Sequence, residues 1–177
     1  MSRKSKRSII LSAASAIILS QGVEKLTLEA VAKEAGISKG GLLHHFPNKQ
    51  ALIIALIKES SDRFYAELEA KAAKDPHEVG KWSRAYVDVT FNDDKKEEDL
   101  HAALTASLFT DPELLGLYRN DYFLWQKKIE ADGIDPVRSA VVRLAVDGLW
   151  FAEIFGVGVP DKKLRDQVTE YLHQMTK

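Results

Sequence analysis

The sequence contains no cysteine among its 177 residues. This absence excludes a disulfide framework, a zinc site built on thiolates and a cysteine nucleophile. No apolar run reaches the ~18 residues that a membrane-spanning helix needs. The basic start of the chain is followed by residues 8–20, where serines interrupt the apolar positions, whereas a signal peptide needs a continuous apolar run and a small-residue cleavage site. We therefore expect a soluble, cytoplasmic protein.

Sequence motifs for catalysis are also missing. The chain has no glycine-rich phosphate loop, no nucleophile elbow and no Ser/His/Asp ordering signal. His44 and His45 are adjacent on a predicted helix, where their side chains diverge by about 100° and cannot share a metal ion. The other histidines have no ligand partner three or four residues away. We expect no enzymatic activity, no cofactor and no metal site.

Helical periodicity, in contrast, runs along the whole chain and predicts an all-α protein of about nine helices. The first helix covers about residues 3–21. A long helix, capped by Asn48 and continuing to about Ala72, follows two short ones. Further helix starts are marked by Asp-Pro pairs, because proline is favoured at the first helical position. Asp111 and Asp135 each stand before a proline at such a start, and Asp161 is predicted to cap the last helix without a proline. Another helix is predicted over about residues 100–108.

The two short helices near the start of the chain are joined by a tight turn. Thr27 is a natural N-cap, and apolar residues then recur at i, i+3, i+4 and i+7. Gly36 supplies a left-handed residue that ends this helix, and Ser38 caps the next one, which ends at Phe46 before a proline. Two capped helices joined through a glycine are typical of a helix-turn-helix, whose second helix enters a DNA major groove. An ordinary corner of two helices in a helical domain would show the same spacing.

The charge distribution favours the DNA-binding interpretation. Residues 1–49 contain eight lysines and arginines and three acids, which gives +5, while the rest of the chain carries −6. Phosphate neutralisation needs a local basic patch and not a high overall isoelectric point. The net charge of −1 is therefore the sum of two unlike parts: residues 1–49, which we call the basic head, and the remaining residues, which we call the acidic body.

The basic head resembles TetR-type one-component bacterial transcriptional regulators. The resemblance is carried by the helix that follows Thr27 and by the sequence SKGGLLHHFPNK at residues 38–49, and it covers roughly residues 5–58. It implies an N-terminal three-helix helix-turn-helix DNA-binding domain over residues 1–47. A long helix then leads into a helical ligand-binding and dimerisation domain over residues 48–177.

The resemblance and the charge together give a set of candidate DNA contacts. Lys39 and Gly41 are placed to reach base edges, the glycine because it lets the backbone come close. Thr27 and the amides that follow it, together with Lys49, are expected to bind phosphates. Leu43 stands where related proteins usually carry tyrosine, so it is excluded. The predicted DNA-binding residues are Thr27, Ser38, Lys39, Gly40, Gly41, His44, His45 and Lys49.

The predicted helix over residues 137–155 is apolar on two opposite sides, so both sides must be covered. One side can face its own domain, and the other can meet a second copy. A central helix of a monomeric bundle would have the same pattern, but the family resemblance implies a dimer. The predicted interface residues are Val142, Val146, Leu149, Glu153, Leu164, Val168 and Leu172.

Aromatic residues are numerous in the acidic body. Aromatics at helical spacing are common in cores, but several together can also wall an apolar pocket. The resemblance implies such a pocket, in which Asp147 either meets a ligand or pairs with Arg143, four residues earlier. The predicted ligand-binding residues are Trp82, Tyr86, Leu104, Tyr122, Trp125, Asp147 and Phe151.

These features predict a homodimeric, ligand-responsive repressor that binds palindromic operator DNA and is released by a small apolar or aromatic effector. Two alternatives stay open. A constitutive DNA-binding architectural protein would need no effector pocket. A protein–protein adaptor that uses the helical pair would leave DNA alone.

Overall fold

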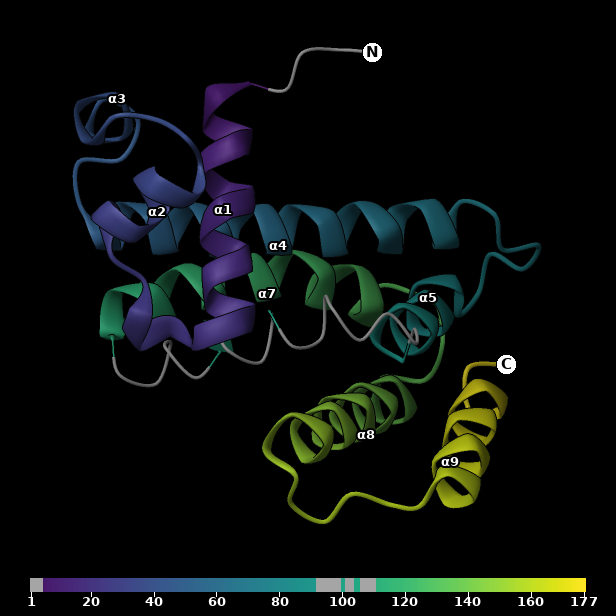
Figure 1. Cartoon of the computed structure of the whole chain (residues 1–177). Coiled ribbons are helices and arrows are strands. Elements are labelled where there is room, and N and C mark those ends of the chain that lie inside the picture. The colour runs from purple at the N-terminus through teal and green to yellow at the C-terminus, as the bar shows by residue number, and fades with distance from the viewer. Residues whose placement is uncertain (1–4, 92–99, 101–103, 106–110) are drawn as a thin grey trace. The chain divides into compact units, whose positions relative to one another are not determined.

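The protein is described by a computed structural model that covers residues 5–91, 100, 104–105 and 111–177. Within these ranges the chain is helical and contains no strand (Figure 1), as the sequence predicted. The helices are α1 (Lys6–Gln21), α2 (Leu28–Glu34), α3 (Lys39–Leu43), α4 (Lys49–Ala72), α5 (Lys81–Thr90), α7 (Pro112–Glu130), α8 (Pro136–Phe155) and α9 (Lys162–Gln174), with a short 3-10 turn η1 (Val23–Lys25) after α1. The helix predicted over residues 100–108 lies mostly outside the described residues.

Side-chain caps set the helix boundaries close to their predicted places. Ser5 is extended and accepts a hydrogen bond from the Ser8 N–H at 3.1 Å, so α1 begins at Lys6 and not at the predicted Arg3. The predicted caps that are confirmed by such hydrogen bonds are Thr27, Ser38, Asn48, Asp111, Asp135 and Asp161.

Two compact units make up the chain. The first unit comprises residues 1–61 and 95–118, and the second unit comprises residues 62–94 and 119–177. The helices α4 and α7 therefore contribute residues to both units. The predicted domain boundary between residues 47 and 48 stays a prediction.

The core of the first unit is built from the apolar sides of α1 to α4. Ile10, Leu26, Leu42 and Leu52 are among its fully buried side chains, and each comes from a different helix or from a connecting segment. Such burial stabilises a protein by about 1.5–3 kcal/mol for each large aliphatic side chain. The short α2 and α3 depend on this packing, because helices of their length are not stable alone in water.

The core of the second unit lies between α5, α7, α8 and the ends of α4 and α9. Its buried side chains include Leu68, Val87, Trp125, Val142 and Leu172. Several of these were predicted to serve a ligand or a partner, and their positions are described below.

Candidate DNA-binding and effector sites

The turn between α2 and α3 has the predicted helix-turn-helix geometry. The Thr27 hydroxyl accepts a hydrogen bond from the Ala30 N–H at 3.1 Å, which satisfies one amide at the start of α2. The Ser38 hydroxyl does the same for the Gly41 N–H at 3.1 Å at the start of α3. Gly36 between them has a φ of +65°, a left-handed conformation that side chains disfavour.

The segment from residue 38 to residue 45, which we call the recognition segment, has a buried and an exposed side. Leu42 is fully buried, and Phe46, just beyond the segment, is 3% exposed and anchors it in the core of the first unit. The helix α3 itself ends at Leu43, before its predicted end at Phe46. The predicted DNA-binding residues that are exposed are Thr27, Ser38, Lys39, Gly40, Gly41, His44 and His45.

Two glycines leave the outer surface of α3 without side chains. A Cβ atom added at Gly40 would meet no atom of the protein within 4 Å, and one at Gly41 would lie 3.2 Å from the Ser38 hydroxyl oxygen. A glycine inside a helix costs about 1 kcal/mol relative to alanine. Because packing within the chain does not require Gly40, its backbone is free for close approach by an external partner.

Two of the predicted DNA contacts have partners within the first unit. The Lys39 ammonium donates a hydrogen bond to the carboxylate of Glu29 on α2. The Lys49 ammonium is half-buried and donates to the Val23 carbonyl at 3.1 Å. Lys49 therefore has a structural contact that competes with its predicted phosphate contact. Neither contact was predicted, because each joins residues that are separated in sequence by more than the three or four positions that pair side chains on a helix.

In the second unit, Asp147 is the centre of a hydrogen-bond network. Its carboxylate accepts hydrogen bonds from the hydroxyls of Tyr86 and Tyr122, and the Arg143 guanidinium lies 3.4 Å from it. Arg143 also donates to the Tyr122 hydroxyl oxygen at 3.0 Å. Burial and the hydrogen bond to Asp147 raise the pKa of Tyr122 to about 12, so this phenol remains a protonated donor. The predicted pairing of Asp147 with Arg143 is present, and two tyrosines add to it.

Trp125 lies beside this network and has an unsatisfied polar atom. Its side chain is 5% exposed, and its ring centroid lies 5.1 Å from that of Tyr122 and 5.3 Å from that of Phe64. The indole Nε1 is buried and has no hydrogen-bond partner among the residues that the structure describes. A buried N–H without an acceptor costs about 1–3 kcal/mol, so this donor calls for an explanation.

Tyr86, Tyr122, Trp125 and Asp147 form what we call the aromatic cluster, and the other three predicted ligand residues are described one by one. Leu104 is buried in the core of the first unit, a different unit from the aromatic cluster. Phe151 is 37% exposed and stacks on Phe155 with ring centroids 5.7 Å apart. Trp82 is half-buried on α5, with the Lys128 ammonium 5.2 Å from its ring centroid. The structure therefore assigns Leu104 to the core of the first unit and the aromatic cluster to the second unit.

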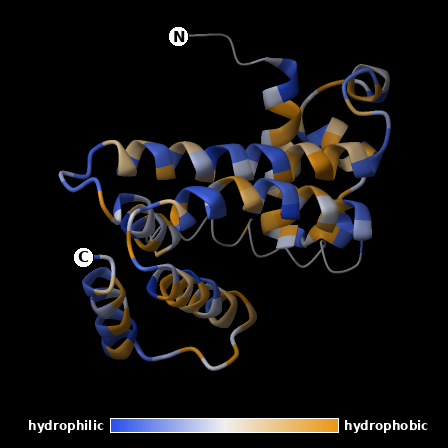
Figure 2. Cartoon of the chain, turned by 180° about the vertical axis from the view of Figure 1, so that it is seen from behind, coloured by the Kyte–Doolittle hydropathy of each residue, from blue (hydrophilic) through white to orange (hydrophobic). Residues whose placement is uncertain are grey.

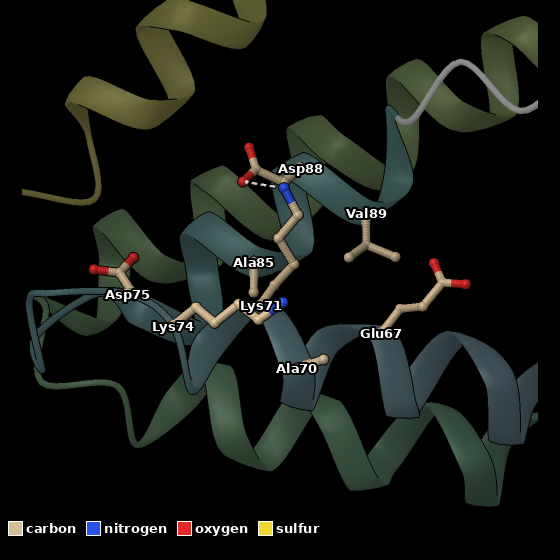
Figure 3. A pocket seen from close by; sticks show the side chains of 8 residues that line it. All are labelled: Glu67, Ala70, Lys71, Lys74, Asp75, Ala85, Asp88 and Val89. Atoms are coloured by element: carbon tan, nitrogen blue, oxygen red, sulfur yellow. Dashed lines mark hydrogen bonds and ion pairs between the residues drawn. The ribbon is translucent and has the colours of Figure 1, made fainter.

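A separate groove lies between α4 and α5 in the second unit (Figure 3). Its lining residues are Glu67, Ala70, Lys71, Lys74, Asp75, Ala85, Asp88 and Val89. Two of its charged residues pair with each other, since Asp88 lies 3.1 Å from the Lys71 ammonium, and Asp88 also lies 3.0 Å from the His173 imidazole. None of its residues was predicted to bind a ligand, and none is aromatic.

The two apolar sides of α8 are present, and one of them is buried within the single chain while the other is exposed. Val142 and Val146 are fully buried within a single chain, and Leu172 of α9 is 3% exposed. Val142, Val146 and Leu172 therefore lie in the core of the second unit, and their assignment to a dimer interface stays a prediction.

The remaining predicted interface residues vary in exposure. Leu149 and Val168 are half-buried against the core of the second unit. Glu153 accepts a hydrogen bond from the Arg165 guanidinium at 2.6 Å, and Leu164 is 51% exposed. The assignment of these four to an interface stays a prediction.

Figure 2 shows α8 as a largely hydrophobic helix. The side of α8 opposite Val142 and Val146 carries exposed apolar residues. They are between 37% and 71% exposed and recur every three or four residues, which is the spacing of a helix–helix seam. Gly148 falls on the same line, and a Cβ atom there would meet nothing within 4 Å. We call this set the α8 stripe, and its members are Val137, Val141, Leu144, Gly148, Phe151 and Phe155.

The capped helical pair with an exposed recognition segment, followed by a helical body, defines the class of helix-turn-helix proteins. Two family models match the chain. "Bacterial regulatory proteins, tetR family" matches residues 10–56, and "Tetracyclin repressor-like, C-terminal domain" matches residues 80–177, more than half of the sequence. The chain belongs to the TetR family, as its motifs predicted. This is a family of transcriptional regulators and not of enzymes.

Individual relatives agree with the family. The chain is 42% identical over 65 residues to the HTH-type transcriptional regulator RutR of Escherichia coli K12, which is 37% of this chain and 31% of RutR. The chain thus spans about a third of the length of the curated relatives it matches. A TetR-family member from Streptomyces coelicolor has a TM-score of 0.72 at 20% identity, covering 98% of this chain and 99% of its own. The multidrug binding protein EbrR, complexed with malachite green, has a TM-score of 0.71 at 21% identity, covering 98% and 99%.

In the part of the chain that the structure describes, no helix combines the length and apolarity needed to cross a membrane. Within the same residues, no three histidine, aspartate or glutamate side chains gather where they could hold a metal ion.

Proposed function

We propose that this chain is a homodimeric transcriptional repressor that binds palindromic operator DNA and is released by a small effector. The observation that carries the DNA-binding part is the exposed surface of the recognition segment, where Lys39, His44 and His45 flank a backbone left bare by Gly40. The net charge of +5 over residues 1–49 supports it, since phosphate contacts need a local basic surface.

Fluorescence anisotropy with the DNA upstream of the protein's own gene tests this proposal. Binding should be tighter than to a scrambled duplex of equal length, and its logarithm should fall linearly with the logarithm of salt concentration. Equal binding to both duplexes would favour an architectural protein instead. No binding to either duplex would favour a protein–protein adaptor.

The aromatic cluster is the proposed effector site. Tryptophan is a donor only, so the unpartnered Trp125 N–H would be satisfied by a ligand that offers an acceptor oxygen or nitrogen. Asp147 already has three donors around it, one of them the Arg143 guanidinium, so this cluster offers no unpaired carboxylate to a cation. We therefore propose an aromatic or apolar effector that carries a hydrogen-bond acceptor.

The helix α4 is the proposed route between the two sites. Its first turn carries Lys49 in the first unit, and the same helix places Leu68 in the core of the second unit. An effector that favours one position of α4 would change the spacing of the two recognition segments in a dimer, and simultaneous binding of both half-sites would be lost. The coupling must be reciprocal and need only be about 5–150-fold.

A single-tryptophan protein tests the effector site. The double substitution Trp82→Phe and Trp150→Phe leaves Trp125 as the reporter of binding, and titrations are compared with and without operator DNA. A ligand that changes Trp125 fluorescence and binds more weakly in the presence of DNA supports the proposal. A ligand with equal affinity in both conditions refutes the coupling but leaves the DNA-binding part intact.

The proposed dimer seam consists of the α8 stripe together with Leu164 and Tyr171 of the next helix, α9. These side chains are exposed in the single chain, and covering them would remove apolar surface from water. Two helices from each copy would form a four-helix interface. Gly148 would let the two copies of α8 approach closely at the middle of the seam.

A further inference from the structure

The contact between Glu29 and Lys39 links the two helices of the helix-turn-helix. Glu29 lies in the first turn of α2, and Lys39 is the first residue of α3. Their side chains are 64% and 57% exposed, so both lie on the surface that also carries the recognition segment. The hydrogen bond from Lys39 lowers the pKa of the Glu29 carboxyl, which keeps it charged at neutral pH.

We propose that Glu29 is a specificity-determining residue, which neutralises and orients Lys39 so that this lysine binds base edges and not DNA phosphates. The proposal rests on the DNA-binding function proposed above. Its physical basis is that net charge and hydrogen-bond donors are separate properties of an ammonium group.

An ammonium group has three N–H donors, and the bond to Glu29 uses one of them. The other two can still donate to neutral acceptors such as O6 and N7 of guanine in the major groove. A phosphate, in contrast, is attracted by the net charge of its partner. The paired Lys39 and Glu29 have no net charge, so a phosphate gains little from Lys39 and is repelled by the carboxylate.

The expected consequence concerns non-specific DNA binding, which comes almost entirely from phosphate neutralisation. In the native chain Lys39 adds little to it. Removing the charge of Glu29 frees Lys39 for a phosphate, so affinity for any DNA sequence rises. Specific binding rises less, because Lys39 is already used there, and the ratio of specific to non-specific affinity falls.

The substitution Glu29→Gln tests this inference, and Glu34→Gln is the matched control. Both remove one negative charge from an exposed glutamate of α2, but only Glu29 contacts Lys39. Affinities for a random-sequence duplex and for the DNA upstream of the gene are measured over a salt series. For the random duplex, Glu29→Gln should steepen the salt dependence by about 0.9 per protomer, the contribution of one added phosphate contact. Glu34→Gln should change this slope much less.

A second background shows whether the effect passes through Lys39. In a Lys39→Ala protein, adding Glu29→Gln should leave the salt slope unchanged. Equal slopes for the two glutamine variants, or an effect of Glu29→Gln that persists without Lys39, would overturn the inference while leaving DNA binding intact. Absence of salt-dependent DNA binding by the native protein would instead refute the proposed function, and the inference with it.

Discussion

Asp132 caps the helix α5 from a distant point in the sequence, and its loss should destabilise the protein strongly. Its carboxylate accepts hydrogen bonds from the N–H groups of Trp82 at 3.0 Å and Ser83 at 2.7 Å. Gly80, the local N-cap of α5, has no side chain that could replace it. Asp132 and Ser83 are 5% and 0% exposed, so water cannot readily take over.

The magnitude follows from these two bonds. Leaving a buried donor unsatisfied costs about 1–3 kcal/mol, and the Trp82 N–H is only partly buried. Asp132→Ala should therefore lower the free energy of unfolding by about 2–5 kcal/mol. Asp132→Asn, which keeps one acceptor oxygen, should fall between the native protein and the alanine variant.

Urea unfolding followed by circular dichroism measures this loss. All variants must be compared at one protein concentration, because the apparent stability of the proposed dimer depends on that concentration. The control is Asp135→Ala, which removes an exposed cap with a single hydrogen bond to the Arg138 N–H at 3.0 Å and should cost about 1 kcal/mol. If Asp132→Ala were no more destabilising than Asp135→Ala, the argument from burial and two lost bonds would be refuted.

Three further predictions concern the dimer, the pH dependence and the effector. Leu144→Arg puts a charge into the α8 stripe and should give a monomer in sedimentation experiments. The control Asn120→Arg, at an exposed polar position of α7, should leave a dimer. A dimeric Leu144→Arg protein would place the seam elsewhere. The hydrogen bond from Arg84 lowers the pKa of Asp75 below its ordinary 3.8, so its contribution to stability is present above that value and is lost as the pH falls through the lowered pKa. Asp75→Asn should therefore reduce stability near about pH 7 and flatten the acid limb of the stability curve, and an unchanged limb would contradict this assignment. Trp125→Phe keeps an aromatic ring but removes the unpartnered donor, so it should weaken an acceptor-bearing effector by about tenfold without changing DNA affinity in its absence.

Local features of this chain could be predicted from the sequence because their causes are local. The caps at Thr27 and Ser38 and the left-handed Gly36 act within three or four residues, and all three are present. The pairing of Asp147 with Arg143 was predictable for the same reason, since residues four apart are neighbours on a helix.

Features that depend on distant segments could not be predicted in this way. The periodicity of α8 shows two apolar sides, but only the packing of Val142 and Val146 into the core of the second unit decides which one is internal. Likewise, Asp132 caps a helix that begins about fifty residues earlier, and Tyr86 reaches Asp147 across a similar separation. The Glu29 carboxylate beside Lys39 also has no local signal in the sequence.

The central claim, that the exposed surface of α3 meets DNA, is tested most directly by the substitution Gly40→Ala. The added methyl group meets nothing within 4 Å in the protein, so the stability should stay unchanged or rise by up to about 1 kcal/mol. Gly116→Ala is the matched control, because Gly116 is also a helical glycine with open space around it, on α7. In anisotropy titrations with the DNA upstream of the gene, we expect Gly40→Ala to bind at least about tenfold more weakly than the native protein and Gly116→Ala to bind equally well. Native affinity of a folded Gly40→Ala protein would contradict the claim.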